Sequence, residues 1–326
     1  MTTAVAPRVS PRSLDTLTLV VAAREDVAEG VMVLILAAPD ARPLPSWRPG
    51  AHVDLLLKPG LIRQYSLCGD PADAHSWRLA VLLDRAGRGG SRFAYEELRE
   101  GALVPVRGPR SAFPLIASPR YLFIAGGIGI TPILPMILRA EQDGAEWSLV
   151  YGGRHRGSMA FLPELARYGE RVRVCPEDEV GLLDLDGLLS QPRPDLLIYC
   201  CGPEALLSAV EQRCARWPAG SLHVERFQGA RTTDDGVSST FRVVFERSGV
   251  AAEVGPGQTI VEVAEEAGVL VSSSCRDGAC GTCEVAVLAG EPDHRDSVLD
   301  AGERAAGKTM MACVSRSRSP ELRLDL

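Results

Sequence analysis

Four cysteines near the end of the chain have a spacing that suits metal chemistry. Cys275, Cys280 and Cys283 lie within the nine-residue stretch CRDGACGTC, and Cys313 follows after twenty-nine intervening residues. Thiolates are required in fours by structural zinc and by iron–sulfur clusters. Structural zinc sites usually present two C-x2-C pairs, whereas this chain has one such pair, one cysteine upstream of it and one distant cysteine. The spacing therefore favours an iron–sulfur cluster over zinc or over four unliganded thiols.

The spacing C-x4-C-x2-C with a distant fourth cysteine is that of plant-type [2Fe–2S] proteins. The residues between the cysteines support this interpretation, because a compact cluster must be wrapped closely by its loop. Gly278, Ala279, Gly281 and Thr282 are small, so their N–H groups can point at sulfur and raise the reduction potential. Glycine also adopts the unusual dihedral angles of a tight wrap. The predicted metal ligands are Cys275, Cys280, Cys283 and Cys313.

Two glycine-containing turns in the middle of the chain suit a nucleotide. The first, GGIGITP at residues 126–132, joins an apolar strand to a helix whose N-terminus carries roughly half a positive charge. It departs from the dinucleotide fingerprint G-x-G-x-x-G, because Pro132 stands where the third glycine belongs. The second, YCCGP at residues 199–203, repeats the order of strand, glycine and proline. Open α/β sheets bind ligands at the carboxyl ends of their strands, so we expect a nucleotide at these turns, although the first alone could be an ordinary turn.

A cation, an aromatic ring and a hydroxyl lie together in the stretch RQYSLC. Arg63 and Tyr65 share one face of the expected strand, and Ser66 lies on the other. The arginine could hold a phosphate and the tyrosine could pack against a flat ring, but alone this pattern also fits a plain, half-exposed strand. The stretch GRGGS at residues 87–91 opens a helix, and its backbone amides with Arg88 could form a second phosphate cradle.

Three units of different secondary structure must position these motifs. Residues 1–117 contain short strands broken by Gly and Pro turns, which predicts a small antiparallel barrel. One helix is expected over residues 91–99, with Ser91 as its N-cap. Residues 118–228 alternate strands with helices, which predicts a parallel sheet covered on both faces.

The end of the chain forms a separate unit. Residues 229–240 are polar and rich in Gly, Ser, Thr and Asp, as in a linker. Residues 241–326 predict strands around one helix at residues 260–267, with Thr259 and Glu262 at capping-box spacing.

Composition and charge exclude several classes of function. Hydrophobic residues make up 46% and charged residues 24% of the 326 residues, as in ordinary globular proteins. The net charge of −7 argues against non-specific binding of nucleic acid. From Ser238 onward there are nine Lys and Arg against fourteen Asp and Glu, which could dock a basic partner or be a solvated face. No stretch approaches the ~18 apolar residues of a membrane helix, and the N-terminus lacks a secretory signal. Nine cysteines without an export signal indicate a reducing cytoplasm.

Taken in order, the motifs and units resemble the reductase components of Rieske oxygenases, and above all the phthalate dioxygenase reductase and vanillate demethylase reductase family. That family has R-x-Y-S-L for flavin, G-G-x-G-x-T-P and C-G-P for a nicotinamide nucleotide, and a C-terminal plant-type ferredoxin domain. The resemblance covers nearly the whole chain from about residue 15, and DHRDSVL at residues 293–299 also looks like the family. It implies an antiparallel β-barrel flavin domain, an α/β parallel-sheet nucleotide domain of the ferredoxin reductase type and a β-grasp ferredoxin domain.

The resemblance also implies roles for individual residues. Flavin would be held by Arg63, Tyr65 and Ser66, with Ser66 near its reactive N5, and the flavin phosphate by Arg88, Gly90 and Ser91. The nucleotide would be bound by Gly127, Gly129, Thr131 and Gly202, with Cys201 near the nicotinamide ring. Ser66 and Cys201 are therefore the residues expected nearest the reaction, and Phe227 is expected to pack near the flavin.

The expected cofactors are FMN, a [2Fe–2S] cluster and NADH. No adenine-binding insertion is evident after the flavin strand, which favours FMN over FAD. The family usually takes NADH, but Arg154 and Arg156 follow the strand where the adenosine ribose would lie and could also accept the 2′-phosphate of NADPH.

The implied function is an electron relay. NADH gives a hydride to the flavin, which passes electrons singly to the cluster, and the cluster passes them to a terminal oxygenase component of the Rieske type. A plant-type cluster near about −400 mV can reduce a Rieske centre at about −150 mV or above. The alternatives are a reductase for another acceptor, such as a cytochrome P450, and a non-catalytic iron–sulfur redox sensor.

Overall fold

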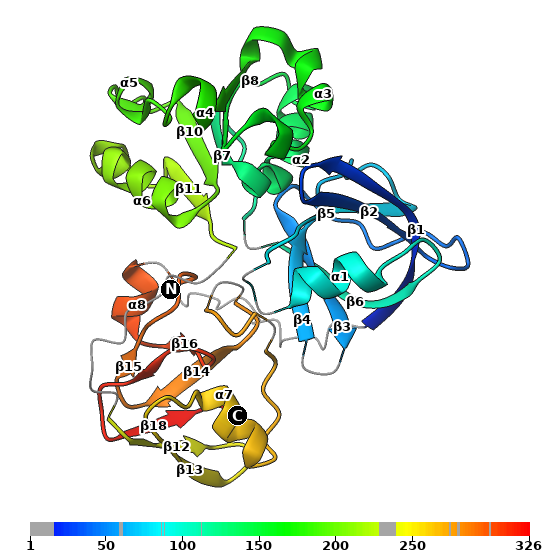
Figure 1. Ribbon diagram of the computed structural model, residues 1–326. Helices are drawn as coiled ribbons and strands as arrows, with labels where there is room; N and C mark the ends of the chain where they lie inside the picture. Colours follow the sequence, from blue (N-terminus) through cyan, green and yellow to red (C-terminus); the bar gives the residue numbers. More distant parts are fainter. Residues whose placement is uncertain are drawn as a thin grey trace, which may run out of the picture.

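The computed structural model describes residues 16–326 apart from 59–60, 86, 88, 112, 228–238, 274, 279–280 and 300. Three sheets of five or six strands divide the chain into successive units, which are distinct bodies in Figure 1. The first sheet is antiparallel, the second is parallel and the third is mixed. The predicted fold class, with a barrel, a covered parallel sheet and a β-grasp unit, is confirmed.

The first unit is a six-stranded antiparallel barrel with the strand order β4-β3-β6-β1-β2-β5. Leu67, directly after β4, forms an antiparallel bridge with Leu79 of β5, and this bridge closes the barrel. A short helix, α1 (Gly90–Glu97), packs against β4 and β5. The strands are β1 (Thr16–Ala28), β2 (Val31–Ala37), β3 (Ala51–Lys58), β4 (Leu61–Ser66), β5 (Ser76–Leu82) and β6 (Leu103–Ser111).

Helix α1 begins differently from the sequence-based prediction. Gly89 occupies the N-cap position with a φ of 82°, and no side chain caps the helix. The Ser91 hydroxyl instead accepts a hydrogen bond from the Asp84 N–H, at 3.0 Å. The prediction of Ser91 as the N-cap is therefore wrong, because its hydroxyl ties the preceding loop to the helix.

The second unit is a parallel sheet with the order β11-β10-β7-β8-β9 and helices on both faces. The chain adds strands outward from β7 through β8 to β9, then crosses to β10 and β11 on the other side, so the order reverses between β7 and β10. The strands are β7 (Arg120–Gly126), β8 (Glu146–Gly153), β9 (Val172–Pro176), β10 (Leu196–Cys201) and β11 (Leu222–Glu225). The α-helices are α2 (Ile130–Gln142), α3 (Leu162–Leu165), α4 (Glu177–Val180), α5 (Leu185–Leu189) and α6 (Glu204–Arg213), and the 3-10 turns are η1 (Gly127–Gly129), η2 (Arg156–Ser158), η3 (Ala166–Arg171) and η4 (Cys214–Arg216).

The first two units share a hydrophobic core. Val31 and Val33 of β2 and Ala80 of β5 point out of the barrel and belong to the same buried cluster as Ile133 and Ile137 of α2. Across this contact, Arg78 of β5 forms an ion pair with Glu164 of α3, at 2.9 Å. The shared core fixes the barrel against the parallel sheet, and α2 lies beside the barrel in Figure 1.

The third unit is a five-stranded mixed sheet with the order β13-β12-β18-β14-β16, packed on α7 (Ile260–Glu266). The first and last strands, β12 and β18, pair in parallel at its centre. Thr259 and Glu262 form the predicted capping box, with N–H to oxygen distances of 3.1 and 2.9 Å. The remaining elements are β12 (Phe241–Phe245), β13 (Val250–Val254), β14 (Glu284–Ala289), β15 (Pro292–Asp293), α8 (Ala301–Ala306), β16 (Thr309–Met311), β17 (Arg316–Ser317) and β18 (Glu321–Leu324).

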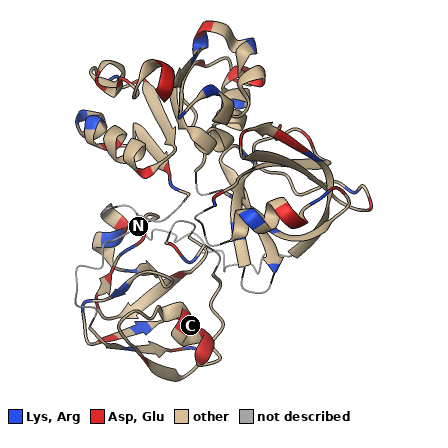
Figure 2. Cartoon of the chain, in the orientation of Figure 1, with Lys and Arg blue, Asp and Glu red and all other residues tan. Residues whose placement is uncertain are grey.

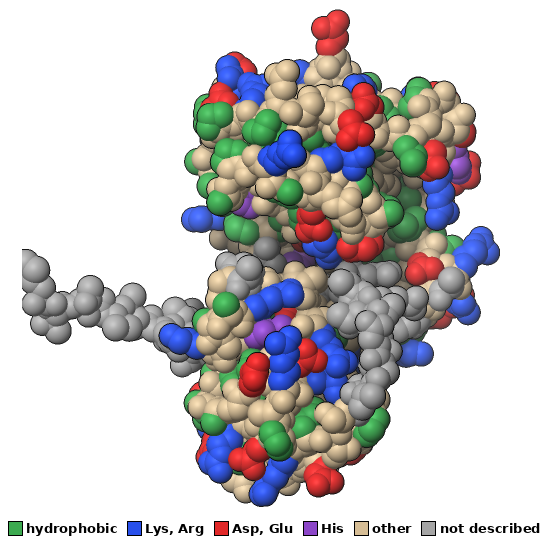
Figure 3. Space-filling view, turned by 90° about the vertical axis from the view of Figure 1, so that its left-hand side faces the viewer, with side chains coloured by type: hydrophobic (Ala, Val, Ile, Leu, Met, Phe, Trp, Pro, Cys, Tyr) green, Lys and Arg blue, Asp and Glu red, His purple; other side chains and the backbone are tan. Residues whose placement is uncertain are grey.

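The surface carries no continuous basic face in the described parts of the chain. Lys and Arg are intermixed with Asp and Glu in all three units (Figure 2). On the face drawn in Figure 3, hydrophobic side chains lie singly or in small groups among polar ones. Within the described residues, no helix has the length and apolar composition needed to cross a membrane.

Candidate functional site

Both predicted nucleotide turns lie at the carboxyl ends of β7 and β10, where the strand order of the parallel sheet reverses. A Cβ atom on Gly129 would lie 2.2 Å from the carbonyl oxygen of Cys201 and 2.7 Å from the Gly202 nitrogen. The two turns therefore touch backbone to backbone, which only glycine permits at this position. An edge where the strand order reverses is where open α/β sheets bind ligands.

The first turn continues directly into helix α2. Gly127 and Gly129 bound the 3-10 turn η1, and Thr131 lies in the first turn of α2. The Thr131 hydroxyl donates to the Ile128 carbonyl oxygen at 2.9 Å, so this buried side chain holds the turn in shape. The turn η1 also contacts β5 of the barrel, which places the nucleotide turn beside the predicted flavin unit.

Cys201 lies at the end of β10, fully buried, with its Sγ atom 3.9 Å from Oε2 of Glu225. Burial raises the pKa of the Cys201 thiol well above its ordinary value, and the neighbouring Glu225 adds to this effect. Burial likewise raises the pKa of Glu225 to about 8. Cys201 is thus a neutral, buried thiol at pH 7, which does not suit attack on a ligand.

Glu225 and Arg226 are two residues at this site that sequence analysis missed. Arg226 follows β11 and donates to Oε2 of Glu204 at 3.0 Å and to Oε2 of Glu211 at 2.7 Å. This clamp fixes the end of β11, and with it Glu225 and Phe227, onto helix α6. The run Glu-Arg-Phe does not by itself indicate the contacts of Glu225 and Arg226, and Phe227, the predicted residue of this run, is 42% exposed.

The predicted flavin strand is β4, and it brings Arg63 to the start of α1. A Cβ atom on Gly90 would lie 2.3 Å from Nε of Arg63, so the guanidinium lies directly over the helix N-terminus. Two sources of positive charge therefore converge there, the arginine and the helix end. Burial raises the pKa of Tyr65 to about 12, so its ring is neutral, and Ser66 is buried. Arg88, predicted at the same place, lies outside the described residues.

The expected adenosine end of the nucleotide site is acidic as well as basic. Arg154 is exposed, and its carbonyl oxygen accepts from the Asp178 N–H at 3.2 Å. Arg156 forms two hydrogen bonds with the carboxylate of Glu179, at 2.8 and 2.9 Å. Of the two arginines expected near a 2′-phosphate, Arg156 is therefore already paired.

Three of the four predicted cluster ligands converge in the third unit. Cys275, Cys283 and the Gly278 backbone all lie close enough to the Cys313 thiol to shift its pKa, although the loop and Cys313 are far apart in sequence. Hydrogen bonding with Cys275, which lowers the pKa, and with Cys283, which raises it, together with burial leaves the pKa of Cys313 raised to about 12. Cys283 and Cys313 are buried, and Cys275 is partly exposed. Cys280 lies outside the described residues.

The loop around these sulfurs fits a compact cluster. The Asp277 N–H donates to Sγ of Cys275 at 3.4 Å, the kind of contact that stabilises a cluster thiolate. A Cβ atom on Gly278 would lie 2.5 Å from the Val314 side chain, so glycine is needed there for the loop to approach the second cysteine segment. Among the described residues no three His, Cys, Asp or Glu side chains form a site for a single metal ion, and a two-iron cluster divides its four ligands between two irons.

Comparison with known proteins places this chain among characterised reductases. The model of the 2Fe-2S iron–sulfur cluster binding domain matches residues 243–318, and that of the oxidoreductase NAD-binding domain matches residues 123–176. The solved structure of phthalate dioxygenase reductase is 36% identical, covers 95% of this chain and 98% of its own, and superposes with a TM-score of 0.73. The chain belongs to the phthalate dioxygenase reductase family. The predicted family, its [2Fe–2S] cluster domain and its NAD-binding domain are thereby confirmed.

Two further relatives extend the range of this family. Phenoxybenzoate dioxygenase subunit beta of Ectopseudomonas oleovorans is 43% identical over 303 residues, which cover 92% of this chain and 94% of the relative. The crystal structure of an intact type IV self-sufficient cytochrome P450 monooxygenase is 44% identical over 95% of this chain, with a TM-score of 0.85, but the match covers 41% of that protein. The same three-unit fold thus occurs both as a nearly full-length chain and as part of a larger protein.

Proposed function

We propose that this protein is a cytoplasmic, NADH-dependent reductase that delivers electrons through FMN and a [2Fe–2S] cluster to a Rieske-type terminal oxygenase. The observation that carries the proposal is the presence in one chain of the strand β4, the paired glycine turns and the converging cysteines. Each suits one cofactor, and together they form an ordered route from a hydride donor to a one-electron acceptor.

The cofactors supply the redox chemistry: hydride acceptance by the flavin and one-electron transfer by the cluster. The chain's residues bind and orient them. Arg63 and the start of α1 would hold the flavin phosphate, while Tyr65 and Ser66 would line the flavin ring. Gly129 and Gly202 would let the two turns meet at the edge where the nucleotide binds, and Cys201 would lie near the nicotinamide as a buried, neutral thiol.

NADH is favoured over NADPH by the charges at the adenosine end of the site. A 2′-phosphate would have to compete with Glu179 for Arg156. It would also approach the acidic first turn of α4, which contains Glu177, Asp178 and Glu179. These negative charges would oppose binding of the negatively charged 2′-phosphate. We expect NADPH to show a much higher KM than NADH in steady-state reduction of ferricyanide.

Spectroscopy of the purified protein tests the relay. We expect bound FMN, iron and acid-labile sulfide, with flavin absorption that bleaches on addition of NADH and electrons that pass to cytochrome c. A protein that contains the cluster but no flavin, and that does not oxidise NADH, would instead be an iron–sulfur sensor.

Reconstitution with separate acceptors tests the partner. The relatives include subunits of dioxygenase systems, which favours an oxygenase component, and the potential of a plant-type cluster suits a Rieske centre. A cytochrome P450 is the second candidate because of the resemblance to part of a P450 chain. We expect NADH-driven turnover with a Rieske oxygenase at a lower reductase concentration than with a P450. The reverse order would replace the oxygenase by a P450 in the proposal.

A further inference from the structure

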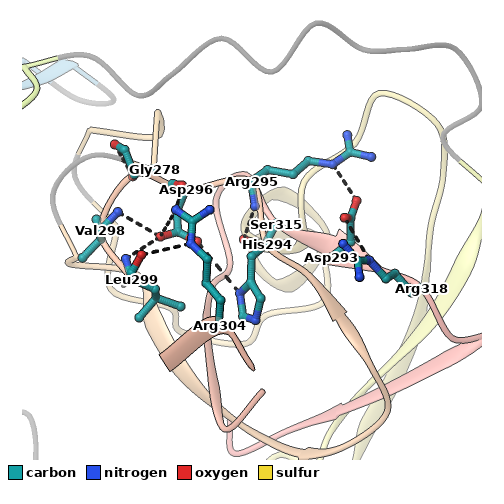
Figure 4. Close-up of polar contacts among 11 residues, drawn as sticks. Gly278, Asp293, His294, Arg295, Asp296, Val298, Leu299, Arg304, Ser315 and Arg318 are labelled. Carbon is teal, nitrogen blue, oxygen red and sulfur yellow. Dashed lines mark hydrogen bonds and ion pairs between the residues drawn. The ribbon is translucent and has the colours of Figure 1, made fainter. Parts of the chain in front are cut away.

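The stretch DHRDSVL, residues 293–299, contains no cysteine, yet it contacts both cysteine segments. We call it the strap. The Ser297 N–H donates to the Gly278 carbonyl oxygen at 2.9 Å, and the Ser297 hydroxyl lies 3.3 Å from the same oxygen. The Arg295 N–H donates to the Ser315 hydroxyl at 3.2 Å. Gly278 lies in the loop that begins at Cys275, and Ser315 follows Cys313, so the strap connects the two segments (Figure 4).

Asp296 gives the strap its shape. Its side chain is 0% exposed, and Oδ1 accepts from the N–H groups of Val298 and Leu299, at 2.9 and 2.8 Å. Arg304 closes the turn from outside, because Nη2 donates to the Asp296 carbonyl oxygen at 2.5 Å and Nε to the Leu299 carbonyl oxygen at 2.9 Å. Figure 4 shows the Val298 and Leu299 N–H groups meeting at the Asp296 carboxylate, with Nη2 of Arg304 3.9 Å from the same Oδ1. The turn that Asp296 holds presents the Ser297 N–H to the cysteine loop.

Contact between Asp296 and Gly278 is close enough to transmit a shift. A Cβ atom on Gly278 would lie 3.0 Å from Cα of Asp296 and 2.5 Å from the Val314 side chain. Gly278 is therefore enclosed between the strap and the residue that follows Cys313. Because Gly278 has no room for even a methyl group between these neighbours, we expect a displacement of Asp296 to move the cysteine loop relative to Cys313.

The second carboxylate oxygen of Asp296 faces His294, whose side chain is 9% exposed. Oδ2 lies 4.0 Å from Nδ1 of His294, and among the described residues neither Oδ2 nor the two ring nitrogens has a hydrogen-bond partner. An asparagine at position 296 would keep the oxygen that accepts from Val298 and Leu299 and could turn its NH2 group toward His294. The substitution Asp296→Asn therefore tests the hydrogen bonds made by residue 296 separately from its negative charge.

We propose that Asp296 is a positioning residue for the [2Fe–2S] cluster, which holds the strap so that the cysteine loop and Cys313 keep the spacing the cluster requires. This inference rests on the proposed ligation by Cys275, Cys280, Cys283 and Cys313. The negative charge of Asp296, paired with Arg304 at 3.9 Å, lies beside the cluster loop, where it would favour the oxidised cluster over the more negative reduced one.

The test compares Asp296→Ala and Asp296→Asn with Asp293→Ala and Asp293→Asn in the full-length holoprotein. Asp293 is the matched control, since it lies on the same strap but bonds Arg295 at 2.8 Å and Arg318 at 3.4 Å on a more exposed side, with 24% of its side chain exposed. Release of iron to a chelator is monitored as the loss of visible absorption. The EPR spectrum and midpoint potential of the reduced cluster are measured on the same samples.

We expect Asp296→Ala to release iron about tenfold faster than the wild type or to retain no cluster, because two buried N–H groups lose their acceptor. Asp296→Asn is expected to restore the wild-type release rate and EPR spectrum while shifting the midpoint potential to a more positive value. Both Asp293 variants should match the wild type in release rate and show a smaller potential shift, because their charge is solvent-screened.

Equal release rates for Asp296→Ala and the wild type, or equally fast release from both alanine variants, would overturn the positioning role. So would an Asp296→Asn protein that releases iron as fast as Asp296→Ala while keeping its fold by circular dichroism. Iron and sulfide analysis of the wild type separates this failure from a failure of the proposed function, since absence of the cluster from the wild type would refute the ligation itself.

Discussion

Replacement of Asp54 by alanine tests how the strand proposed to hold flavin is anchored in the barrel. Asp54 lies on β3 and is 1% exposed. Its carboxylate accepts from Nη1 and Nη2 of Arg110 on β6, at 2.8 and 2.7 Å, and from Nε2 of Gln64 on β4, at 3.0 Å. Because Gln64 lies between Arg63 and Tyr65, this one carboxylate connects the flavin strand to the centre of the sheet.

The loss of stability expected for Asp54→Ala comes from the unpaired charge of Arg110. Arg110 keeps a guanidinium that is 19% exposed and has lost its countercharge. Removal of one partner from a buried ion pair costs about 3–5 kcal/mol, and the partial exposure of Arg110 places the expected cost near the lower end, about 3 kcal/mol. The exposed pair Arg139–Asp143 has the same kind of contact at 2.8 Å with side chains 56% and 43% exposed, and its loss should cost at most about 0.5 kcal/mol.

Urea unfolding followed by tryptophan fluorescence measures this difference, since Trp47 and Trp77 lie in the core of the barrel. Asp54→Ala should lower the unfolding midpoint strongly and reduce the flavin retained after gel filtration, whereas Asp143→Ala, the matched control, should change neither. The double variant Asp54→Leu with Arg110→Met should recover most of the loss, because no buried charge remains unpaired. Equal midpoints for Asp54→Ala and Asp143→Ala would refute the view that the buried pair anchors β4.

Three further predictions address pH, the nucleotide and the cluster. Burial, followed by the charge of Arg110, lowers the pKa of His52 from 6.5 to about 4. The free energy of unfolding should therefore fall by up to about 1.4 kcal/mol per pH unit as the pH drops from 6.5 to 4. His52→Gln should flatten this slope, and an unchanged slope would contradict the lowered pKa of His52. Gly129→Ala places a methyl group 2.2 Å from the Cys201 carbonyl oxygen and should raise the KM for NADH at least about tenfold while FMN content stays constant; a wild-type KM would show that the two turns do not need their close contact. Cys283→Ser should remove the iron–sulfur absorption and cytochrome c reduction but preserve NADH–ferricyanide activity, and persistence of the absorption would argue against ligation by this cysteine.

The parts of the fold that could be predicted from the sequence are those with strong local signals. The capping box of Thr259 and Glu262 forms as its spacing indicates, and the rhythm of strands and helices identified all three units. The error at Ser91 has a local cause, because a hydroxyl beside a glycine pair has two competing partners, the helix N-terminus and the Asp84 backbone. Sequence alone does not decide between two hydrogen bonds of similar strength.

The roles of residues that depend on contacts between distant segments could not be predicted from the sequence. Glu225 joins the proposed nucleotide site only because β11 pairs in parallel with β10 and brings it opposite Cys201. Asp54 and Arg110 are fifty-six positions apart and meet only when β3 pairs with β6. Charged residues are usually exposed, so a sequence-based analysis assigns such groups to the surface unless the pairing of the strands is known.

The departure from the dinucleotide fingerprint has a physical explanation in the contact between the two turns. In the fingerprint, the third glycine allows the helix to pack closely on its strand. Here the close approach lies between neighbouring turns, since a Cβ atom on Gly202 would be 3.0 Å from Cα of Gly126, and one on Gly126 would be 2.7 Å from the Pro203 ring. Glycine is therefore required where the turns after β7 and β10 meet, and not at the third position of the fingerprint in the helix. Position 132 is free to hold proline, which has no N–H to satisfy in the first turn of α2. The segments GGIGITP and CGP, far apart in the sequence, thus form one edge of the sheet and one proposed nucleotide site.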